Sequence, residues 1–350
     1  MMRAVVYRGP EDLRLESRST PAIGPDEALL KVLSAGICGT DLRILHGAHR
    51  KYPSGTIRIP GHEVAGEIAA VGERVKGLKV GQRFFVAPNM GCGHCRHCVS
   101  GNNNRCADYS AFGVTMDGAF AEYMRIPATT ILQGNMMPIR RDTDPAAAAL
   151  IEPFACVLRG QDAVNLHLGD VVLIIGAGPI GIMHTLLARL RGAGRVIVSE
   201  MLDSRLAQAA AAGADRVVDA AREDVTAVVL EESGGDGADV VIVAAPAHTA
   251  QQDALELAAI GGHINFFGGL PKERPIIQFD SNLVHYKELH VTGTTACSTD
   301  DCRRAAALVD AGRVDLARIV SGRFPLDRFN EAFVAAEDRM SLKIVIEPQS

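Results

Sequence analysis

Four cysteines stand close together on a loop rich in glycine and asparagine. They follow the spacing C-x2-C-x2-C-x7-C and are Cys92, Cys95, Cys98 and Cys106. Four thiolates can surround one tetrahedral Zn²⁺ at about 2.3 Å each, and this closed shell leaves no coordination position for a substrate. The spacing therefore predicts a structural zinc site. The alternatives are an iron–sulfur site, disulfides or a zinc ribbon, and ribbons usually hold two C-x2-C pairs further apart.

A second group of reactive side chains is scattered along the sequence. It supplies a thiolate, an imidazole and two carboxylates, from Cys38, His62, Glu63 and Glu152. Each residue alone has an ordinary structural explanation, such as a buried cysteine, a core histidine or an acid on a helix surface. Any functional interpretation of this group therefore depends on the combination.

A glycine motif follows the apolar run at residues 171–175. Its members are Gly176, Gly178, Pro179, Ile180 and Gly181. An apolar run that ends at glycine and resumes with helical spacing is typical of a buried parallel strand, a tight turn and a helix. Gly176 allows the turn, Gly178 lets the backbone approach a pyrophosphate, and Gly181 lets the helix pack closely on the strand. Glu200 ends the next apolar run, 24 residues after Gly176. This is near the roughly 20-residue spacing of the carboxylate that binds ribose hydroxyls, so the segment predicts a dinucleotide site.

The elements that must position these groups change character along the chain. Up to about residue 132, short runs of strand length alternate with Gly, Pro and Asp, which predicts a mainly β half. Asp144-Pro145 is typical of a helix start, and we expect one alanine-rich helix through Cys156 at the domain boundary. Between residues 170 and 292 strands and helices alternate, which predicts six parallel strands with crossovers. The remaining tail is too short for a core of its own, so we expect it to return to the N-terminal half.

Composition narrows the function. A chain of 350 residues with 47% hydrophobic content favours two packed domains. The net charge of −5 gives no basic surface for nucleic acid, which favours a small-molecule ligand. No export signal and no apolar run of about 18 residues stand out, so we expect a cytoplasmic protein without membrane partners. In such a chain, eight cysteines indicate metal binding rather than disulfides.

Taken together, the motifs resemble the zinc-dependent alcohol dehydrogenases of the medium-chain dehydrogenase/reductase superfamily. The resemblance covers essentially the whole chain and rests on Gly61-His62-Glu63-x-x-Gly66, Cys38-x-Thr40-Asp41, the cysteine lobe and the glycine motif. Glu152-Pro153, with the segments 266–269 and 285–288, is similar to the sorbitol (polyol) and threonine dehydrogenase branch. The implied fold class is α/β, with a Rossmann-type doubly wound parallel sheet inserted in a mainly β, GroES-like catalytic domain. The implied domains are 1–155 with a zinc lobe at about 89–107, 156–293 for NAD, and 294–350 returning to the catalytic domain.

The resemblance also implies a catalytic zinc. Its ligands would be Cys38, His62 and either Glu63 or Glu152, and the open position would let the metal act as a Lewis acid. We favour Glu152 because adjacent residues such as His62 and Glu63 rarely reach one metal comfortably. Cofactors would be one catalytic zinc, one structural zinc and NAD.

A proton relay is implied as well. Thr40 matches the hydroxyl that passes the substrate proton on, and Asp41 is a candidate partner that fixes the tautomer of His62. Where related enzymes often place a histidine, this chain has Arg43, which cannot shuttle protons. The relay must then end at His46, His49 or water.

The expected activity is NAD-dependent oxidation of a secondary alcohol, a sorbitol-like polyol with or without a phosphate, by a homo-oligomer (dimer or tetramer). Glu200 favours NAD⁺ over NADP⁺, although Arg205 is placed where it can bind a 2′-phosphate. One alternative is an L-threonine 3-dehydrogenase-like enzyme. Another is a nucleotide-sensing scaffold without turnover, which would not need the full set of scattered donors.

A basic segment lies between two of the motifs. Its members are Arg43, His46, His49, Arg50, Lys51 and Arg58. Such runs are commonly solvated loops. The alternative is that some of them bind an anionic substrate group through charge-assisted hydrogen bonds.

Overall fold

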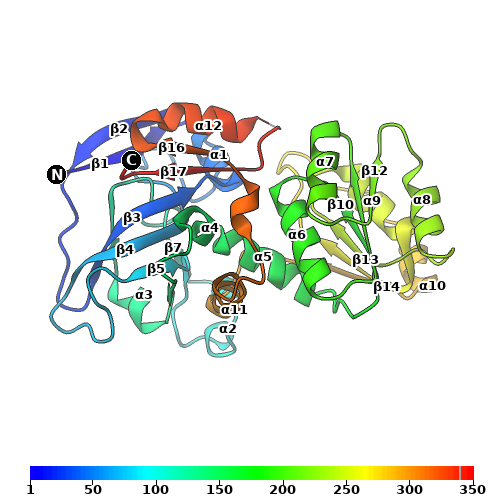
Figure 1. Cartoon of the computed structure of the whole chain (residues 1–350), viewed down its shortest axis with the longest axis horizontal. Coiled ribbons are helices and arrows are strands. Elements are labelled where there is room, and N and C mark those ends of the chain that lie inside the picture. Colours follow the sequence, from blue (N-terminus) through cyan, green and yellow to red (C-terminus); the bar gives the residue numbers. More distant parts are fainter. Residues whose placement is uncertain (339) are drawn as a thin grey trace. The chain divides into compact units, whose positions relative to one another are not determined.

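Both ends of the chain contribute to one unit of the structure. The computed structural model describes residues 1–338 and 340–350, which form two units. Unit 1 contains Met1–Ala155 and Cys297–Ser350, and unit 2 contains Cys156–Ala296. In Figure 1 the blue N-terminal strands and the red C-terminal strands lie together in unit 1.

Unit 1 is built on a seven-stranded sheet with the order β16-β17-β3-β4-β5-β9, and β8 pairs with β3. The C-terminal strand enters this sheet by antiparallel pairing of Val345 with Gly36. Buried and partly buried residues alternate along β3, as expected for a strand with one face on the core. Its strands are β3 (Ala28–Gly36), β4 (Glu63–Val71), β5 (Arg83–Val86), β8 (Tyr123–Ile126), β9 (Met136–Pro138), β16 (Val320–Pro325) and β17 (Lys343–Glu347).

Two hairpins and short helices complete unit 1. The hairpins are β1 (Met2–Gly9) with β2 (Asp12–Arg18), and β6 (Asn89–Met90) with β7 (Ser110–Ala111). Helical segments are α1 (Gly39–Leu45), α2 (Arg96–Val99), η1 (Asn103–Arg105), α3 (Ala128–Leu132), α4 (Pro145–Ala149), α11 (Thr299–Asp310), η2 (Leu316–Ile319), η3 (Leu326–Arg328) and α12 (Phe329–Glu337). Apolar residues from both parts of the chain share one core, including Leu30, Phe120, Phe333 and Ile346.

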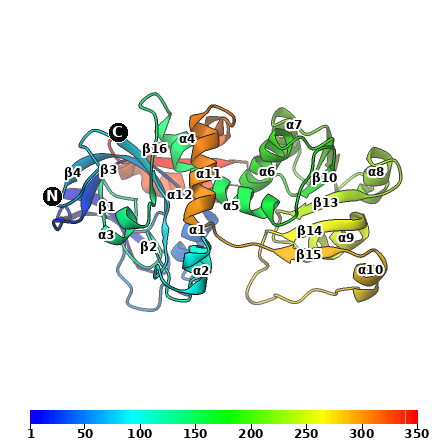
Figure 2. The ribbon, with the colours of Figure 1, turned by 90° about the horizontal axis from the view of Figure 1, so that it is seen from below.

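Unit 2 holds a six-stranded parallel sheet with the order β12-β11-β10-β13-β14-β15. The order reverses between β10 and β13, and ligands bind parallel α/β sheets at such a switch point. Figure 2 shows β13, β14 and β15 side by side in this order. The strands are β10 (Val171–Ile175), β11 (Arg195–Glu200), β12 (Arg216–Asp219), β13 (Ala238–Val243), β14 (Ala258–Phe266) and β15 (His290–Gly293). The helices are α6 (Pro179–Leu190), α7 (Asp203–Ala211), α8 (Val225–Glu232), α9 (His248–Leu257) and α10 (Ser281–Tyr286). The predicted α/β fold class and parallel sheet are confirmed.

One helix differs from its predicted extent. The alanine-rich helix is divided at Leu150 into α4 and α5 (Ile151–Asp162), because Pro153 has no N–H to donate to the carbonyl of Ala149 in a continuous helix. Helix α9 ends at Leu257, because Ala258 already pairs with Ala238 as part of β14. Among the described residues, no helix has the length and apolar character that a membrane span needs.

Candidate active site

The cysteine lobe lies between the paired strands β6 and β7 of unit 1. Its four Sγ atoms, those of Cys92, Cys95, Cys98 and Cys106, all lie within 4.8 Å of one another. The Sγ of Cys98 is 3.5 Å from that of Cys95 and 4.0 Å from that of Cys92. Sulfur ligands at about 2.3 Å from one tetrahedral zinc are about 3.8 Å apart, so the four side chains fit a zinc ion. None of these four cysteines forms a disulfide, which excludes the disulfide alternative for the lobe.

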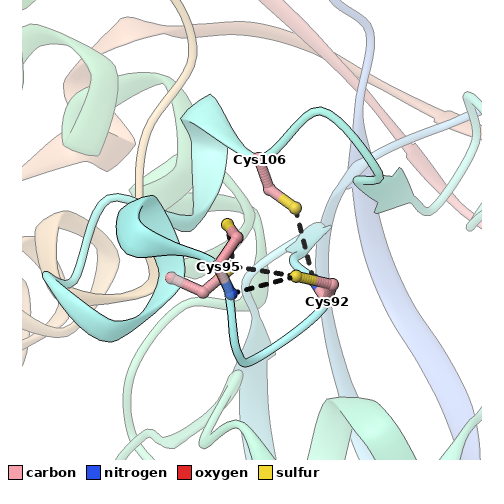
Figure 3. A group of neighbouring side chains, drawn as sticks. Cys92, Cys95 and Cys106 are labelled. Atoms are coloured by element: carbon pink, nitrogen blue, oxygen red, sulfur yellow. Dashed lines mark hydrogen bonds between the residues drawn. The ribbon is translucent and has the colours of Figure 1, made fainter.

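The backbone of the lobe favours the thiolate form of Cys92 and Cys95, whereas burial raises the pKa of the Cys98 thiol to about 12. Figure 3 shows the N–H groups of Cys92 and Cys95 bonded to the sulfurs of Cys106 and Cys92, each at 3.4 Å. Backbone hydrogen bonds, above all at Cys98, lower the pKa of the Cys95 thiol to about 7. Gly91 makes room for the group, since a Cβ there would lie 2.3 Å from the Sγ of Cys98. Zinc binds the deprotonated thiol, so the local backbone prepares Cys92 and Cys95 as ligands.

A buried asparagine anchors the lobe to the rest of unit 1. Asn103 donates from Nδ2 to the carbonyl of Asn89 at 2.8 Å and accepts from the N–H of Thr299 at 2.9 Å. The second bond joins the lobe to the first residue of α11. The lobe is therefore fixed by a residue that comes from the C-terminal part of the chain.

A second donor set lies where α1 and β4 begin. Cys38 is the N-cap of α1, His62 precedes β4, and Glu63 is its first residue. Their ligand atoms lie within 4.8 Å of one another, and His62 and Glu63 are buried. A thiolate, an imidazole and a carboxylate in this arrangement fit a zinc ion with one position open. His62 and Glu63 are adjacent in the sequence, yet their ligand atoms face one site. Successive side chains diverge within a strand, but His62 lies outside β4.

Lys343 neutralises Glu63 and was not found from the sequence. Its Nζ lies 2.7 Å from Oε1 and 2.6 Å from Oε2 of Glu63, and it also donates to the carbonyl of Ile37 at 2.8 Å. Burial lowers the pKa of Lys343, but the charges of Glu63 and Cys38 outweigh it and leave the pKa raised. A buried ammonium therefore balances the negative charge of the donors. The sequence shows only a lysine in an apolar strand, 280 residues from its partner.

Asp41 orients the second donor set. Its Oδ2 accepts from the N–H of Cys38 at 2.9 Å, and its Oδ1 lies 3.6 Å from Nδ1 of His62. Burial lowers the pKa of His62, but the Asp41 carboxylate raises it well above its ordinary value. A carboxylate beside the outer ring nitrogen makes an imidazole a better metal ligand and fixes its orientation.

Glu152 lies at the start of α5 with a buried side chain. Its Oε1 is 3.7 Å from the Sγ of Cys297. The carboxylate that lies within 4.8 Å of the ligand atoms of both Cys38 and His62 is that of Glu63. Burial is the main cause that raises the pKa of Glu152. The charge of His62 lowers this pKa, and the charge of Glu63 raises it. The geometry thus favours Glu63 over Glu152 as the third donor. Cys297, which the sequence analysis did not single out, is the neighbour of Glu152.

The relay residues fall into two environments. Thr40 Oγ1 accepts a hydrogen bond from Arg43 at 3.1 Å. His46 bridges two carboxylates, with Nδ1 2.5 Å from Glu11 and Nε2 2.7 Å from Glu337, and these hydrogen bonds raise its pKa. By contrast, burial lowers the pKa of the half-buried His49. A neutral imidazole can accept a proton, so His49 suits the relay better than His46.

The predicted dinucleotide residues line one cavity of about 650 Å³ in unit 2. Gly176 adopts a φ of +102°, and a Cβ on Gly181 would lie 1.9 Å from the carbonyl oxygen of Gly176, so the turn requires both glycines. Glu200 accepts from the N–H groups of Ala177 at 3.0 Å and Met201 at 2.6 Å. Its carboxylate is thereby held at the end of β11, beside the turn. The predicted residues that line this cavity are Gly176, Gly178, Pro179, Ile180, Gly181, Glu200 and Arg205.

Both parts of this architecture match known families. Residues 24–138 match the alcohol dehydrogenase GroES-like domain, and residues 179–311 match the zinc-binding dehydrogenase domain. An L-threonine 3-dehydrogenase of Chromobacterium violaceum is 34% identical over 331 residues, which cover 93% of this chain and 94% of that protein. The chain belongs to the zinc-dependent medium-chain dehydrogenases.

Other members of this dehydrogenase family are similar over nearly their full length. An L-galactonate-5-dehydrogenase of Escherichia coli K12 is 32% identical, covering 95% of this chain and 94% of that protein. A structure described as a zinc-binding dehydrogenase of Sinorhizobium meliloti 1021, bound to NADP, has a TM-score of 0.92 at 32% identity, covering 99% of each chain. A 2R,3R-butanediol dehydrogenase structure from Bacillus subtilis has a TM-score of 0.90 at 26% identity, covering 99% of this chain and 100% of that chain. These relatives confirm a zinc-type oxidoreductase that acts on a small-molecule alcohol with a nicotinamide cofactor.

Proposed function

We propose that the protein oxidises a secondary hydroxyl of a polyol or a closely related polyhydroxy compound and transfers the hydride to NAD⁺. The donor set of Cys38, His62 and Glu63 carries this proposal, because unlike ligands with one open position suit catalysis whereas four thiolates do not. The dinucleotide cavity of unit 2 supports it. We assign one catalytic zinc to this set and one structural zinc to the cysteine lobe.

The residues of unit 1 have separate roles in this reaction. Cys38, His62 and Glu63 would hold a zinc ion, which supplies Lewis-acid polarisation of the substrate hydroxyl. Asp41 keeps the imidazole of His62 in its ligating orientation. The hydroxyl of Thr40 can pass on a proton, and Arg43 beside it cannot take that proton up. We assign the acceptor role to His49.

Glu200 supports NAD⁺ as the preferred cofactor, because a carboxylate binds both ribose hydroxyls and repels a 2′-phosphate. Arg205, 3.8 Å from Glu200, is the competing feature. Known structures of similar proteins hold NADP in one case and NADH in another. The ratio of kcat/KM for the two cofactors tests the assignment. We expect wild type to favour NAD⁺ and Glu200→Gln to lose that preference, and a wild-type preference for NADP⁺ would contradict it.

Formation of NADH with a panel of substrates tests the activity itself. The panel should contain neutral polyols, sugar acids, simple alcohols and L-threonine, since named relatives act on threonine and L-galactonate. An L-threonine 3-dehydrogenase activity is the second candidate, because several relatives with this name are 32% to 34% identical in sequence to the chain. Turnover of threonine alone would replace the polyol proposal, and no turnover with any alcohol would favour a nucleotide-sensing scaffold.

A further inference from the structure

The basic segment predicted to be either a solvated loop or an anion contact is divided by the fold. Arg43 bonds to Thr40, and His46 bridges two carboxylates. Arg58 lies over the ring of Tyr52, 4.9 Å from its centroid, and donates to the carbonyl of Lys51. These residues are therefore occupied by contacts within the protein.

Arg50 and Lys51 instead line the same pocket as Arg105, a cation of the cysteine lobe. Together with Arg105 they line a pocket of about 490 Å³ in unit 1. The remaining lining comes from residues 104, 106, 107 and 109, so no carboxylate lines the pocket. Across residues 1–338 and 340–350, none of the three cations forms an ion pair within 4.0 Å. Three positive charges thus converge on one cavity without neutralisation.

We propose that this pocket binds the anionic end of a polyhydroxy substrate, a terminal carboxylate or phosphate. This proposal rests on the proposed function. Two guanidinium groups offer planar forks that match the oxygens of either anion, and an ammonium adds a third donor. Tyr109, whose ring centroid is 5.7 Å from Nζ of Lys51, forms a wall of the same pocket.

The loop that carries these cations also leads to the metal donors. The N–H of Lys51 donates to Nδ1 of His49 at 3.3 Å, and the charges of both His62 and Arg50 act on His49. His49 is thus bonded to Lys51 of the pocket and senses the charge of His62, and none of the proposed zinc ligands of the donor set lines the pocket. A substrate that uses both must be extended. The carboxylate of threonine is only two carbons from its reacting carbon, so the pocket favours a longer sugar acid or polyol phosphate.

A different explanation is that the cations balance the cysteine lobe. Four thiolates around Zn²⁺ carry a net charge of −2, and Cys106 itself lines the pocket. Under this explanation, removal of a pocket cation would weaken zinc retention in the lobe and would not affect an anion. Removal of a pocket cation should therefore weaken anion binding under the first explanation and zinc retention under the second.

The test compares Arg105→Gln and Arg50→Gln with Arg96→Gln, an exposed arginine of the lobe that does not line the pocket. Calorimetry measures binding of inorganic phosphate and of a six-carbon aldonate to the zinc-loaded protein without nucleotide. We expect each pocket variant to weaken anion binding about tenfold at low salt, as for one charge-assisted hydrogen bond, and Arg96→Gln to leave it unchanged. Zinc content should stay the same in all three variants.

A kinetic comparison separates the two anions. KM is measured for a six-carbon alditol, its aldonate and its phosphate ester, and the pocket variants should raise KM only for the charged substrate that the pocket serves. The proposal would be overturned if both pocket variants bound anions as wild type does, or if they lost zinc from the cysteine lobe without a change in anion binding. If anion binding depends on Arg105 but no alcohol is oxidised, the proposed function fails while the pocket remains an anion site.

Discussion

The cysteine lobe and the donor set that we propose to be catalytic are two candidate zinc sites in one unit, and they are built in opposite ways. The lobe draws four identical ligands from one short segment, Cys92 to Cys106, and backbone N–H groups of the same segment donate to the sulfurs of Cys92 and Cys106. The donor set takes unlike ligands from Cys38, His62 and Glu63 and needs Lys343 from the last strand to balance its charge. A closed site can thus be local, whereas an open site depends on the whole fold. The predictions below test this contrast.

Loss of a ligand from the open set should have the largest effect. We expect Cys38→Ser to lower kcat/KM about a thousandfold or more, because loss of several kcal/mol of metal stabilisation costs a factor of ten per 1.36 kcal/mol. Metal analysis should show one zinc per chain fewer than wild type, with the lobe zinc retained. Wild-type turnover in this variant would show that the donor set is not catalytic.

A comparison of the two carboxylates identifies the third ligand. We expect Glu63→Gln to lower kcat about a hundredfold and to weaken one zinc, since Glu63 is grouped with Cys38 and His62. Glu152→Gln should lower kcat about tenfold and retain both zincs, as is typical of residues that support metal ligands. Zinc content and steady-state kinetics measure both effects. The opposite ranking would make Glu152 the ligand and Glu63 the partner of Lys343 only.

Loss of a cysteine from the lobe should lower the stability of the protein and leave its turnover nearly unchanged. We expect Cys95→Ser to lose one zinc and to lower Tm by about 10 °C, taking a loss of about 3 kcal/mol and a shift of 2–4 °C per kcal/mol. At low temperature its kcat should stay within about threefold of wild type. A large fall in kcat with unchanged Tm would mean that the lobe takes part in catalysis.

The smallest effect concerns the contact that holds α1, which carries Thr40, to β1–β2 and α12. Hydrogen bonds that His46 donates to the carboxylates of Glu11 and Glu337 raise its pKa, so this contact stabilises the fold fully below pH 6.5 and is lost as the pH rises through the higher folded pKa. Because the pair is exposed, we expect less than about 1 kcal/mol. The free energy of unfolding of wild type should fall by this amount relative to His46→Gln between pH 6 and pH 9. An identical pH dependence of the two proteins would contradict this role.

The contrast also explains what the sequence could predict. The cysteine spacing and the glycine motif involve contiguous residues, so their chemistry is visible before any fold is known. The division of the helix at Leu150 was also accessible, because Pro153 lacks the required N–H. In contrast, the ion pair of Lys343 with Glu63 and the pocket of Arg50, Lys51 and Arg105 join distant segments. No local pattern marks such pairs, because they form only when strand register and loop paths are set.

The discontinuous composition of unit 1 has a consequence for the order of folding during synthesis. Unit 2 is complete once residue 296 has been made, but β3 must wait for Val345 to pair with Gly36. Until the final strand arrives, the C-terminal end of β3 has an unpaired edge at Ala35 and Gly36, and the carboxylate of Glu63 lacks its lysine partner. Domains generally fold as units as they emerge from the ribosome. The inserted unit can therefore be folded before the open donor set, whose three ligands all lie in the first segment of unit 1, receives its lysine from the last strand.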